Sequence, residues 1–375
     1  MRIAFYAPLK RPDHAVPSGE RELARLFLRA LALAGHEPFL AARLRSYDRS
    51  GDPRRQARLA RLGNRLARRF CRTCRAAPPA LWFTYHLYHK APDWIGPAVA
   101  DALGIPYVVA EASHARKQEL GPWGLGHRAA AEAIRRADAV IGINPADRAG
   151  VLPLLADPVR WIPLPPFLDA AAFDPDPGGR RRAASGPVRL ITVAMMREGD
   201  KLASYRLLGA ALRRLPDLPW SLEIVGDGPA RDAVAAALEG LGDRLRWAGE
   251  LDTKAVAARL AAADLFVWPA IGEALGMALL EAQASGLPVV AGAAGGVGAI
   301  VISEVTGLLV PPGDAGAFAA ATRRLIRDPE ARARLGAAAR RHVCREHDLP
   351  AAARRLAAVI DALAGAPSRP SRPGR

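Results

Sequence analysis

The stretch DLFVWPAIGEALGMALLEAQASGLPVVA, residues 264–291, decides the fold expected for this chain. Its apolar runs at 264–268 and 287–291 are typical of buried strands, and residues 274–284 have the apolar composition of a buried helix. A helix between two consecutive strands joins them in parallel. The stretch therefore predicts one βαβ unit of a parallel sheet.

Two glutamates flank the expected helix. Glu273 lies at the strand-to-helix junction, and Glu281 lies eight residues further on. At about 1.5 Å per helical residue the two carboxylates are roughly 12 Å apart, which suits the two ends of one elongated ligand. Gly276 and Met277 fall in the expected first turn, where free N–H groups and the helix dipole favour a diphosphate. We expect a sugar hydroxyl at Glu273 and a ribose at Glu281.

The wider motif resembles the donor site of a known enzyme family. The pattern P-x3-E-x2-G-x4-E-A-x2-S-G-x-P-V-V-A, followed by Gly-Gly at 295–296 and TGLLVPPGD at 306–314, is similar to the family 4 retaining glycosyltransferases. The resemblance implies the α/β GT-B fold, in which two Rossmann-like doubly wound parallel-sheet domains face a central cleft. Ala274-Leu275 replaces the glycine and aromatic residue usual in the family.

Two cations follow the strand expected at residues 188–195. Arg197 and Lys201 can clamp both phosphates of a leaving nucleotide and neutralise the charge that develops as the glycosyl bond breaks. Their spacing resembles the family's R-x-n-K-G donor motif, with Leu202 in place of the glycine. The resemblance implies that both act in catalysis together with Glu273.

Two glycine-containing loops are further candidates for donor binding. Gly226, Asp227 and Gly228 resemble the family's turn beneath the nucleotide base. Gly19, preceded by Ser18, lies between the first expected strand and the first expected helix, where backbone N–H groups can approach a phosphate. Family members usually have two glycines in that loop, and this chain has one.

Polar residues follow the third and fourth expected strands, at the edge where open α/β sheets bind ligands. His114 resembles the family's active-site histidine, so we expect it at the reaction centre. Glu111, Tyr85 and His86 are expected to form the acceptor wall. His86 and His89 are three residues apart, but the sequence shows no carboxylate partner for a metal.

Alternating strands and helices predict two parallel-sheet domains separated by a linker. Asp174 and Asp176 match a D-x-D metal motif, but their proline-rich surroundings make this a false match, and we expect no essential divalent metal. The expected segments are an acceptor domain at 1–165, a linker at 166–187, a donor domain at 188–346, a crossing helix at 347–365 and a disordered basic tail at 366–375.

The net charge of +16 comes almost entirely from arginine. The functional explanation is attraction to an anionic surface, either nucleic acid, acidic glycan or phospholipid, among which charge alone does not choose. GC-rich coding is the alternative explanation. The helix expected at 53–75 carries an apolar and a basic stripe, which suits either a membrane surface or packing on the sheet with a solvated basic face. These stripes contain Leu59, Leu62, Leu66 and Phe70, and Arg54, Arg58, Arg61, Arg65, Arg68 and Arg72.

No run of about 20 apolar residues occurs, and MRIAFYAPLK lacks a signal-peptide core, so we expect a cytoplasmic protein, peripheral at the inner face of the membrane. The resemblance implies a UDP-, GDP- or ADP-sugar donor and a glycan or lipid-linked acceptor. The expected setting is cell-surface polysaccharide or glycolipid synthesis, with no cofactor beyond the donor.

Three other functions compete with this interpretation. A nucleotide-sugar epimerase on the same fold would bind the donor without an acceptor. A basic membrane- or nucleic-acid-binding protein would use the arginines and leave the glutamates idle, although we expect no nucleic acid. A glycoside hydrolase needs carboxylates about 5 to 9.5 Å apart, which the expected spacing of Glu273 and Glu281 does not meet.

Overall fold

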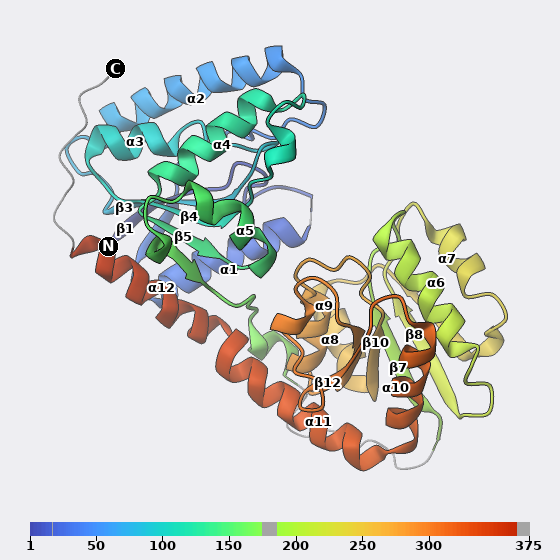
Figure 1. The fold of residues 1–375 in the computed structure, drawn as a ribbon. Helices are drawn as coiled ribbons and strands as arrows, with labels where there is room; N and C mark the ends of the chain where they lie inside the picture. The colour runs from blue at the N-terminus through green and yellow to red at the C-terminus, as the bar shows by residue number, and fades with distance from the viewer. Residues whose placement is uncertain (17, 175–185, 366–375) are drawn as a thin grey trace. The chain divides into compact units, whose positions relative to one another are not determined.

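A computed structural model describes residues 1–16, 18–174 and 186–365 (Figure 1). It divides into a first unit, made of Met1–Pro165 with the chain from Leu349 onward, and a second unit, Pro166–Asp348. The described residues form two six-stranded parallel sheets, as the sequence predicted. Two expected segments lie outside the described residues: the tail at 366–375 and the part of the linker at 175–185, which contains Asp176.

The first sheet has the strand order β2-β1-β3-β4-β5-β6, and every neighbouring pair is parallel. Helices cover both of its faces (Figure 1). The strands are β1 (Arg2–Tyr6), β2 (Glu37–Leu40), β3 (Leu81–Leu87), β4 (Tyr107–Ala112), β5 (Ala139–Gly142) and β6 (Trp161–Pro163). The helices are α1 (Gly19–Leu33), α2 (Pro53–Cys74), α3 (Gly96–Leu103), α4 (Gly124–Arg136), α5 (Arg148–Val151) and α12 (Leu349–Ala364).

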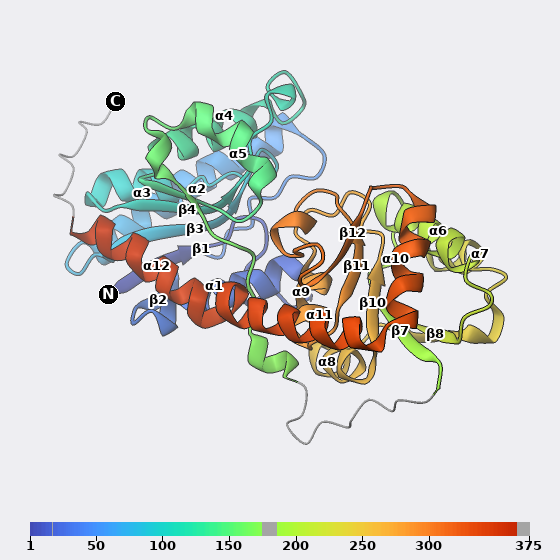
Figure 2. The ribbon, with the colours of Figure 1, turned by 60° about the horizontal axis from the view of Figure 1, so that its bottom comes forward.

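The second sheet has the order β12-β11-β10-β7-β8-β9, again fully parallel. Figure 2 shows its strands between two groups of helices. The strands are β7 (Val188–Val193), β8 (Trp220–Val225), β9 (Leu245–Gly249), β10 (Leu265–Trp268), β11 (Val289–Gly292) and β12 (Gly307–Val310). The helices are α6 (Asp200–Leu212), α7 (Arg231–Ala237), α8 (Thr253–Ala262), α9 (Met277–Ala284), α10 (Ala315–Arg327) and α11 (Pro329–His342).

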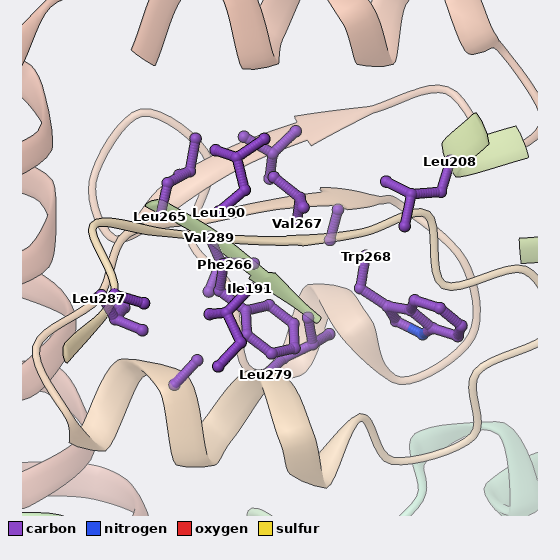
Figure 3. Close-up of a cluster of buried hydrophobic side chains, with 14 of the residues drawn as sticks. Leu190, Ile191, Leu208, Leu265, Phe266, Val267, Trp268, Leu279, Leu287 and Val289 are labelled. Carbon is purple, nitrogen blue, oxygen red and sulfur yellow. The ribbon is translucent and has the colours of Figure 1, made fainter. Parts of the chain in front are cut away.

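The core of the second unit forms around β10, whose four residues are all buried. Figure 3 shows Ile191 of β7, Phe266 of β10 and Leu279 of α9 directed toward one another. Each large apolar side chain buried here stabilises the fold by about 1.5 to 3 kcal/mol. This buried strand holds the loop that follows it in a fixed position.

Helix α9 begins at Met277, three residues later than the sequence predicted. Gly276 precedes it in the left-handed conformation, with φ of 66°, which a helix cannot continue. Glu273 therefore lies in the loop and not on the helix. The separation of roughly 12 Å, which assumed eight helical residues between Glu273 and Glu281, does not apply.

Residues 166–174, expected to be linker, belong to the second unit. Leu168 and Phe173 are buried in its core, and the Leu168 N–H donates to the His347 carbonyl at 3.0 Å. The Ala170 N–H donates to the Asp348 carboxylate at 3.0 Å. Helix α12 belongs to the first unit, where it packs against α1.

The apolar stripe of α2 packs on the first sheet. Leu59 and Ala67 are buried, and the ring of Phe70 meets Trp82 edge-on with centroids 5.3 Å apart. Leu62 remains 38% exposed. All arginines of the helix are exposed. The helix therefore packs on the sheet with its apolar stripe and exposes its basic face to solvent, which is the second of the two alternatives given by the sequence. Among the described helices, none combines the length and apolar character needed to cross a membrane.

Gly226 tests how tightly the loops after β7 and β8 are packed. A Cβ atom there would lie 2.0 Å from the Ala194 carbonyl oxygen, and its φ of 132° disfavours other residues. We expect Gly226→Ala to lower the free energy of unfolding by about 2 to 4 kcal/mol, measured by denaturant titration. Gly298→Ala, where a Cβ meets no atom within 4 Å, is the control. Equal stability of the two variants would contradict this packing.

Candidate functional site

The loops after β7 and β8 press closely against each other. The Met196 N–H donates to the Asp227 carbonyl at 2.9 Å, and the Ala230 N–H donates to the Met196 carbonyl at 3.0 Å. A Cβ on Gly228, whose φ is 152°, would lie 2.3 Å from the Met196 carbonyl oxygen. The two glycines of the Gly-Asp-Gly turn are therefore required by this close backbone approach.

Lys201 and Glu273 meet at the carboxyl edge of the second sheet. Lys201, in the first turn of α6, places its Nζ 2.6 Å from Glu273 Oε2. Trp268, the last residue of β10, donates from its indole Nε1 to the same oxygen at 3.2 Å. The Lys201 ammonium also lies 5.4 Å from the centre of the Trp268 ring. This arrangement holds one cation and one carboxylate ready for a polar ligand.

Arg197 is exposed in the loop between β7 and α6. The described residues give its guanidinium no ion-pair or hydrogen-bond partner, so it is available to an anion. Asp227 is also exposed, and its carboxylate accepts a hydrogen bond from the Gly228 N–H at 2.7 Å. The structure thus places a guanidinium and an ammonium on the segment that follows β7.

Two glycines lie directly behind Glu273. A Cβ on Gly295 would lie 2.0 Å from the Glu273 carbonyl oxygen, and one on Gly296 would lie 2.1 Å from the Ala274 carbonyl oxygen. The Gly296 N–H donates to the Glu273 carbonyl at 3.2 Å. The Gly-Gly motif thus fixes the backbone that carries Glu273.

Helix α9 places Gly276 and Met277 at its start and Glu281 one turn further on. Gly276 is buried, and Met277 and Glu281 are partly buried. Burial raises the pKa of Glu281 to about 7. The described residues give its carboxylate no hydrogen-bond partner, so it can still accept hydrogen bonds from hydroxyl groups.

A second polar group lies in the first unit, at the carboxyl edge of its sheet. His86 of β3 places Nδ1 2.6 Å from Glu20 Oε2 and 3.7 Å from Glu111 Oε2. The Tyr85 hydroxyl donates to Glu20 Oε2 at 3.3 Å. Ser18 caps α1 by accepting from the Arg21 N–H, which positions Glu20 in the first turn. Glu111, Tyr85 and His86, the expected acceptor residues, are thus brought together.

The charges in this group depend on one another. Burial alone lowers the pKa of His86, but the carboxylates of Glu111 and Glu20 outweigh it and raise that pKa to about 9. Burial raises the pKa of Glu111 to about 7 against the attraction of His86. Burial also raises the pKa of Asp147, a further carboxylate near His86. At neutral pH the group holds a cationic imidazole among carboxylates.

His114 has different neighbours from those of His86. Its ring lies 4.4 Å from that of His127, and its carbonyl oxygen is in close contact with Gly150. Burial and the neighbouring His127 lower the pKa of His114. Glu111, rather than His114, is the residue from the end of β4 that contacts His86. Gly19 begins α1, and a Cβ there would meet no atom within 4 Å.

Of the two carboxylates beside His86, Glu111 was expected from the sequence and Glu20 was not. One ligand atom each from Glu20, His86 and Glu111 lies within 4.8 Å of the other two, and these residue types can bind a divalent cation. The 2.6 Å separation of His86 and Glu20 is that of a charge-assisted hydrogen bond. With His86 protonated, its Nδ1–H donates this bond to the Glu20 carboxylate.

Residues 190–342 match the family model described as glycosyl transferases group 1. They form a group 1 glycosyl transferase domain. A D-inositol 3-phosphate glycosyltransferase from Salinispora arenicola is 36% identical over 209 residues, which cover 50% of this chain and 47% of that protein. A GDP-mannose-dependent alpha-(1-6)-phosphatidylinositol monomannoside mannosyltransferase from Mycolicibacterium smegmatis is 32% identical over 192 residues, which cover 47% of this chain and 50% of that protein.

The chain spans about half the length of the curated relatives it matches. Its fold is similar over nearly its whole length to Anabaena Alr3699/HepE, a protein solved in complex with UDP. The TM-score is 0.73 at 17% identity, covering 96% of this chain and 100% of the other. The predicted GT-B fold is thereby confirmed.

The sequence analysis did not predict three residues of the Lys201–Glu273 group and the His86 group: Glu20, Trp268 and Asp147. Glu20 directly follows Ser18-Gly19, so its place in the first turn of a helix after β1 was a usable signal. Trp268 ends a strand and points to the sheet edge, but an apolar run alone does not reveal its indole N–H. Asp147 had only its position after β5 as a signal.

Glu281 gives the group 1 glycosyl transferase domain a characteristic pH dependence. The pKa of Glu281 in the folded protein, about 7, lies above its ordinary value of 4.5. The folded state therefore binds the proton more tightly than the unfolded state, and the stability that this proton adds is complete below pH 4.5 and is lost as the pH rises through 7. Glu281→Gln should therefore be more stable than wild type above pH 7, by up to about 3 kcal/mol, with the difference shrinking toward pH 5. Thermal unfolding between pH 5 and 8.5 checks this.

Glu250→Gln is the control for Glu281→Gln, because Glu250 is an exposed glutamate of the same unit. It should follow the wild-type curve at every pH. Parallel curves for wild type and Glu281→Gln would show that the Glu281 carboxylate is not desolvated.

Proposed function

We propose that this chain is a retaining glycosyltransferase of family 4, which transfers a sugar from a nucleotide diphosphate sugar to a hydroxyl group of an acceptor. The observation that carries the proposal is the Lys201–Glu273 pair at the carboxyl edge of the second sheet, 2.6 Å apart and within the group 1 glycosyl transferase domain. The names of its relatives support it, since the Mycolicibacterium smegmatis protein is GDP-mannose-dependent. UDP bound to Anabaena Alr3699/HepE supports a nucleotide donor.

Each donor-side residue has a role in this proposal. Arg197 and Lys201 bind the diphosphate and stabilise the charge that builds up on it as the glycosyl bond breaks. The first N–H groups of α9, at Met277, bind the same phosphates. Glu273 accepts a hydrogen bond from a sugar hydroxyl, and Glu281 accepts hydrogen bonds from the ribose.

The reaction needs no protein nucleophile and no metal in this proposal. The two cations already supply the charge that a divalent metal provides in other phosphate sites. Lys201 is neutralised by Glu273 before the donor binds, and a diphosphate brings further negative charge to it. Charge stabilisation of the leaving group is then the main catalytic contribution of the second unit.

Ligand-induced stabilisation tests the proposal directly. A panel of UDP-, GDP- and ADP-sugars should contain one class that raises the melting temperature, because a ligand at 100 times its Kd stabilises the fold by about 2.7 kcal/mol. The same donor should be consumed in a transfer assay. A chain that none of these nucleotides stabilises would contradict the proposed function.

Arg197→Ala isolates the role of the phosphate-binding cation. Because Arg197 is exposed and unpaired among the described residues, its loss should leave stability unchanged. We expect kcat to fall about a hundred- to a thousandfold with the donor identified in the panel. Arg246→Ala, which removes another exposed arginine of the second unit, should keep wild-type activity. Near-normal turnover of Arg197→Ala would exclude Arg197 from the phosphate site.

We also propose that the basic face of α2 binds an anionic membrane surface. Its arginines are all exposed, and a shallow hollow of about 340 Å³ near its start is lined by Asp52, Arg54, Arg55, Arg58 and Arg61. Because the apolar stripe packs on the sheet, attraction to lipid head groups is electrostatic, with Leu62 the exposed leucine of the helix. Binding to the membrane surface would bring the enzyme close to a lipid-linked acceptor.

Vesicle flotation measures this membrane association. Replacing Arg61, Arg65 and Arg68 by serine should reduce binding to phosphatidylglycerol vesicles at low salt about tenfold or more, since each basic residue contributes about 1 kcal/mol. Binding should also weaken as salt screens the charges. The control replaces Arg206, Arg334 and Arg341, three exposed arginines of the second unit, by serine. Equal loss in both triple variants would mean that net charge, and not α2, is responsible.

A further inference from the structure

The loop between β4 and α4, residues 113–123, carries the most exposed large apolar side chain among the described residues. Leu120 is 99% exposed, so folding gives its side chain almost no contact with the rest of the chain. Pro122 beside it is exposed, and Arg116 and Lys117 are exposed cations of the same loop. Single exposed leucines are common on protein surfaces, so the surroundings of Leu120 decide whether it has a role.

Main-chain hydrogen bonds fix the tip of this loop. The Gly121 N–H donates to the Gln118 carbonyl at 3.2 Å, and the Gly124 N–H donates to the Gly121 carbonyl at 3.0 Å. Leu120 lies within the first of these two consecutive turns. The backbone of the loop therefore presents its side chain at the surface.

Side chains fasten the loop to the start of α2. The Gln56 amide of α2 donates from Nε2 to the Pro122 carbonyl at 2.9 Å. The Trp123 indole donates to the Asp48 carbonyl, shortly before α2, at 2.9 Å. Leu120 is two residues from this attachment, so it lies next to the arginine-lined hollow at the start of α2. The leucine and the hollow belong to one surface of the first unit.

The charge of the hollow favours a phosphate-bearing partner. Its lining has four arginines and one carboxylate, Asp52, which caps α2 by accepting the Arg54 N–H at 2.9 Å. Arg55 lies 3.8 Å from Asp48, and the described part of the chain gives the other three arginines no ion-pair partner. Guanidinium groups bind phosphate oxygens well, so an excess of them suits an anionic surface.

Leu120 selects among the anionic surfaces that attract such a hollow. Nucleic acid and acidic glycan present anionic groups to arginine but offer no apolar layer for a leucine side chain. An anionic phospholipid membrane has both, because its phosphate groups lie directly above its acyl chains. The exposed leucine beside the arginines matches this layering.

We propose that Leu120 inserts into the acyl region of an anionic phospholipid surface while the arginines at the start of α2 bind its phosphate groups. This inference rests on the membrane association proposed for α2 and adds an apolar contact from a different element. The two contacts respond differently to sodium chloride. Salt screens the attraction of the arginines, whereas it does not weaken the burial of a leucine side chain.

Leu120→Ser tests the apolar contact. The variant should keep wild-type stability, because Leu120 is almost fully exposed in the folded chain. Its binding to vesicles of phosphatidylglycerol and phosphatidylcholine, measured by flotation, should fall about tenfold or more. This factor should stay the same as sodium chloride is added, whereas the loss caused by replacing Arg61, Arg65 and Arg68 should shrink. Val159→Ser, at a residue of the first unit that is 75% exposed, should bind as wild type does.

Leu120→Trp reports insertion directly. Tryptophan favours the membrane interface, so this variant should bind at least as tightly as wild type. Its added fluorescence, measured as the difference from wild type, should be quenched by lipids brominated on their acyl chains. The added fluorescence of Val159→Trp should not be quenched by these lipids.

The outcomes separate the insertion from the membrane association on which it rests. A wild-type chain that does not bind anionic vesicles at low salt overturns both. Binding of Leu120→Ser within about twofold of wild type overturns the insertion alone when the arginine variant is weakened. An added tryptophan at position 120 that escapes quenching in a vesicle-bound chain also overturns the insertion, and assigns Leu120 to a partner other than lipid.

Discussion

The donor-side group depends on the pairing of β10 with β7. Phe266 is in register with Ile191, so these parallel strands, far apart in the sequence, end side by side at the same edge of the sheet. The segments that follow them then meet, and Lys201 reaches Glu273 although 72 residues separate them. A shift of this register would separate Lys201 from Glu273. The ion pair at the sheet edge therefore depends on the burial and pairing of β10.

Backbone contacts at this edge restrict which residues it can contain. Carbonyl oxygens of the loop after β7 lie against Gly226 and Gly228, and the Glu273 carbonyl lies against Gly295. A side chain at any of these positions would separate loops that carry the polar groups. Packing at the second sheet's edge is thus achieved by main chain against main chain, which leaves the longer side chains free to face a ligand.

The sequence predicted much of this architecture because buried parallel strands are short apolar runs. The helix expected at 53–75 and the strand expected at 264–268 agree with α2 and β10 to within one residue. Helix α6 was missed. Its buried residues lie around much of its circumference, so no single apolar stripe indicates it, and Gly209 in its middle permits contact with the Ala237 carbonyl.

The candidate sites were predictable to different degrees. A linear motif identified Arg197, Lys201 and Glu273, but not the ion pair that joins two of them. The start of α9 was misplaced because the left-handed conformation of Gly276 is not visible in composition. Glu20 lies 66 residues before His86, and only the position of β1 beside β3 brings them together. The contact between Glu20 and His86 therefore depends on the strand order of the sheet, which a single sequence does not specify.

Helix α12 has a consequence for how the protein is made. The second unit is one continuous segment inserted between the two parts of the first, and α12 returns to pack against α1. During synthesis the second unit has all of its residues before the first does. The sheet that emerges earliest from the ribosome completes its helical cover last, so the inserted unit can fold while its host is still unfinished.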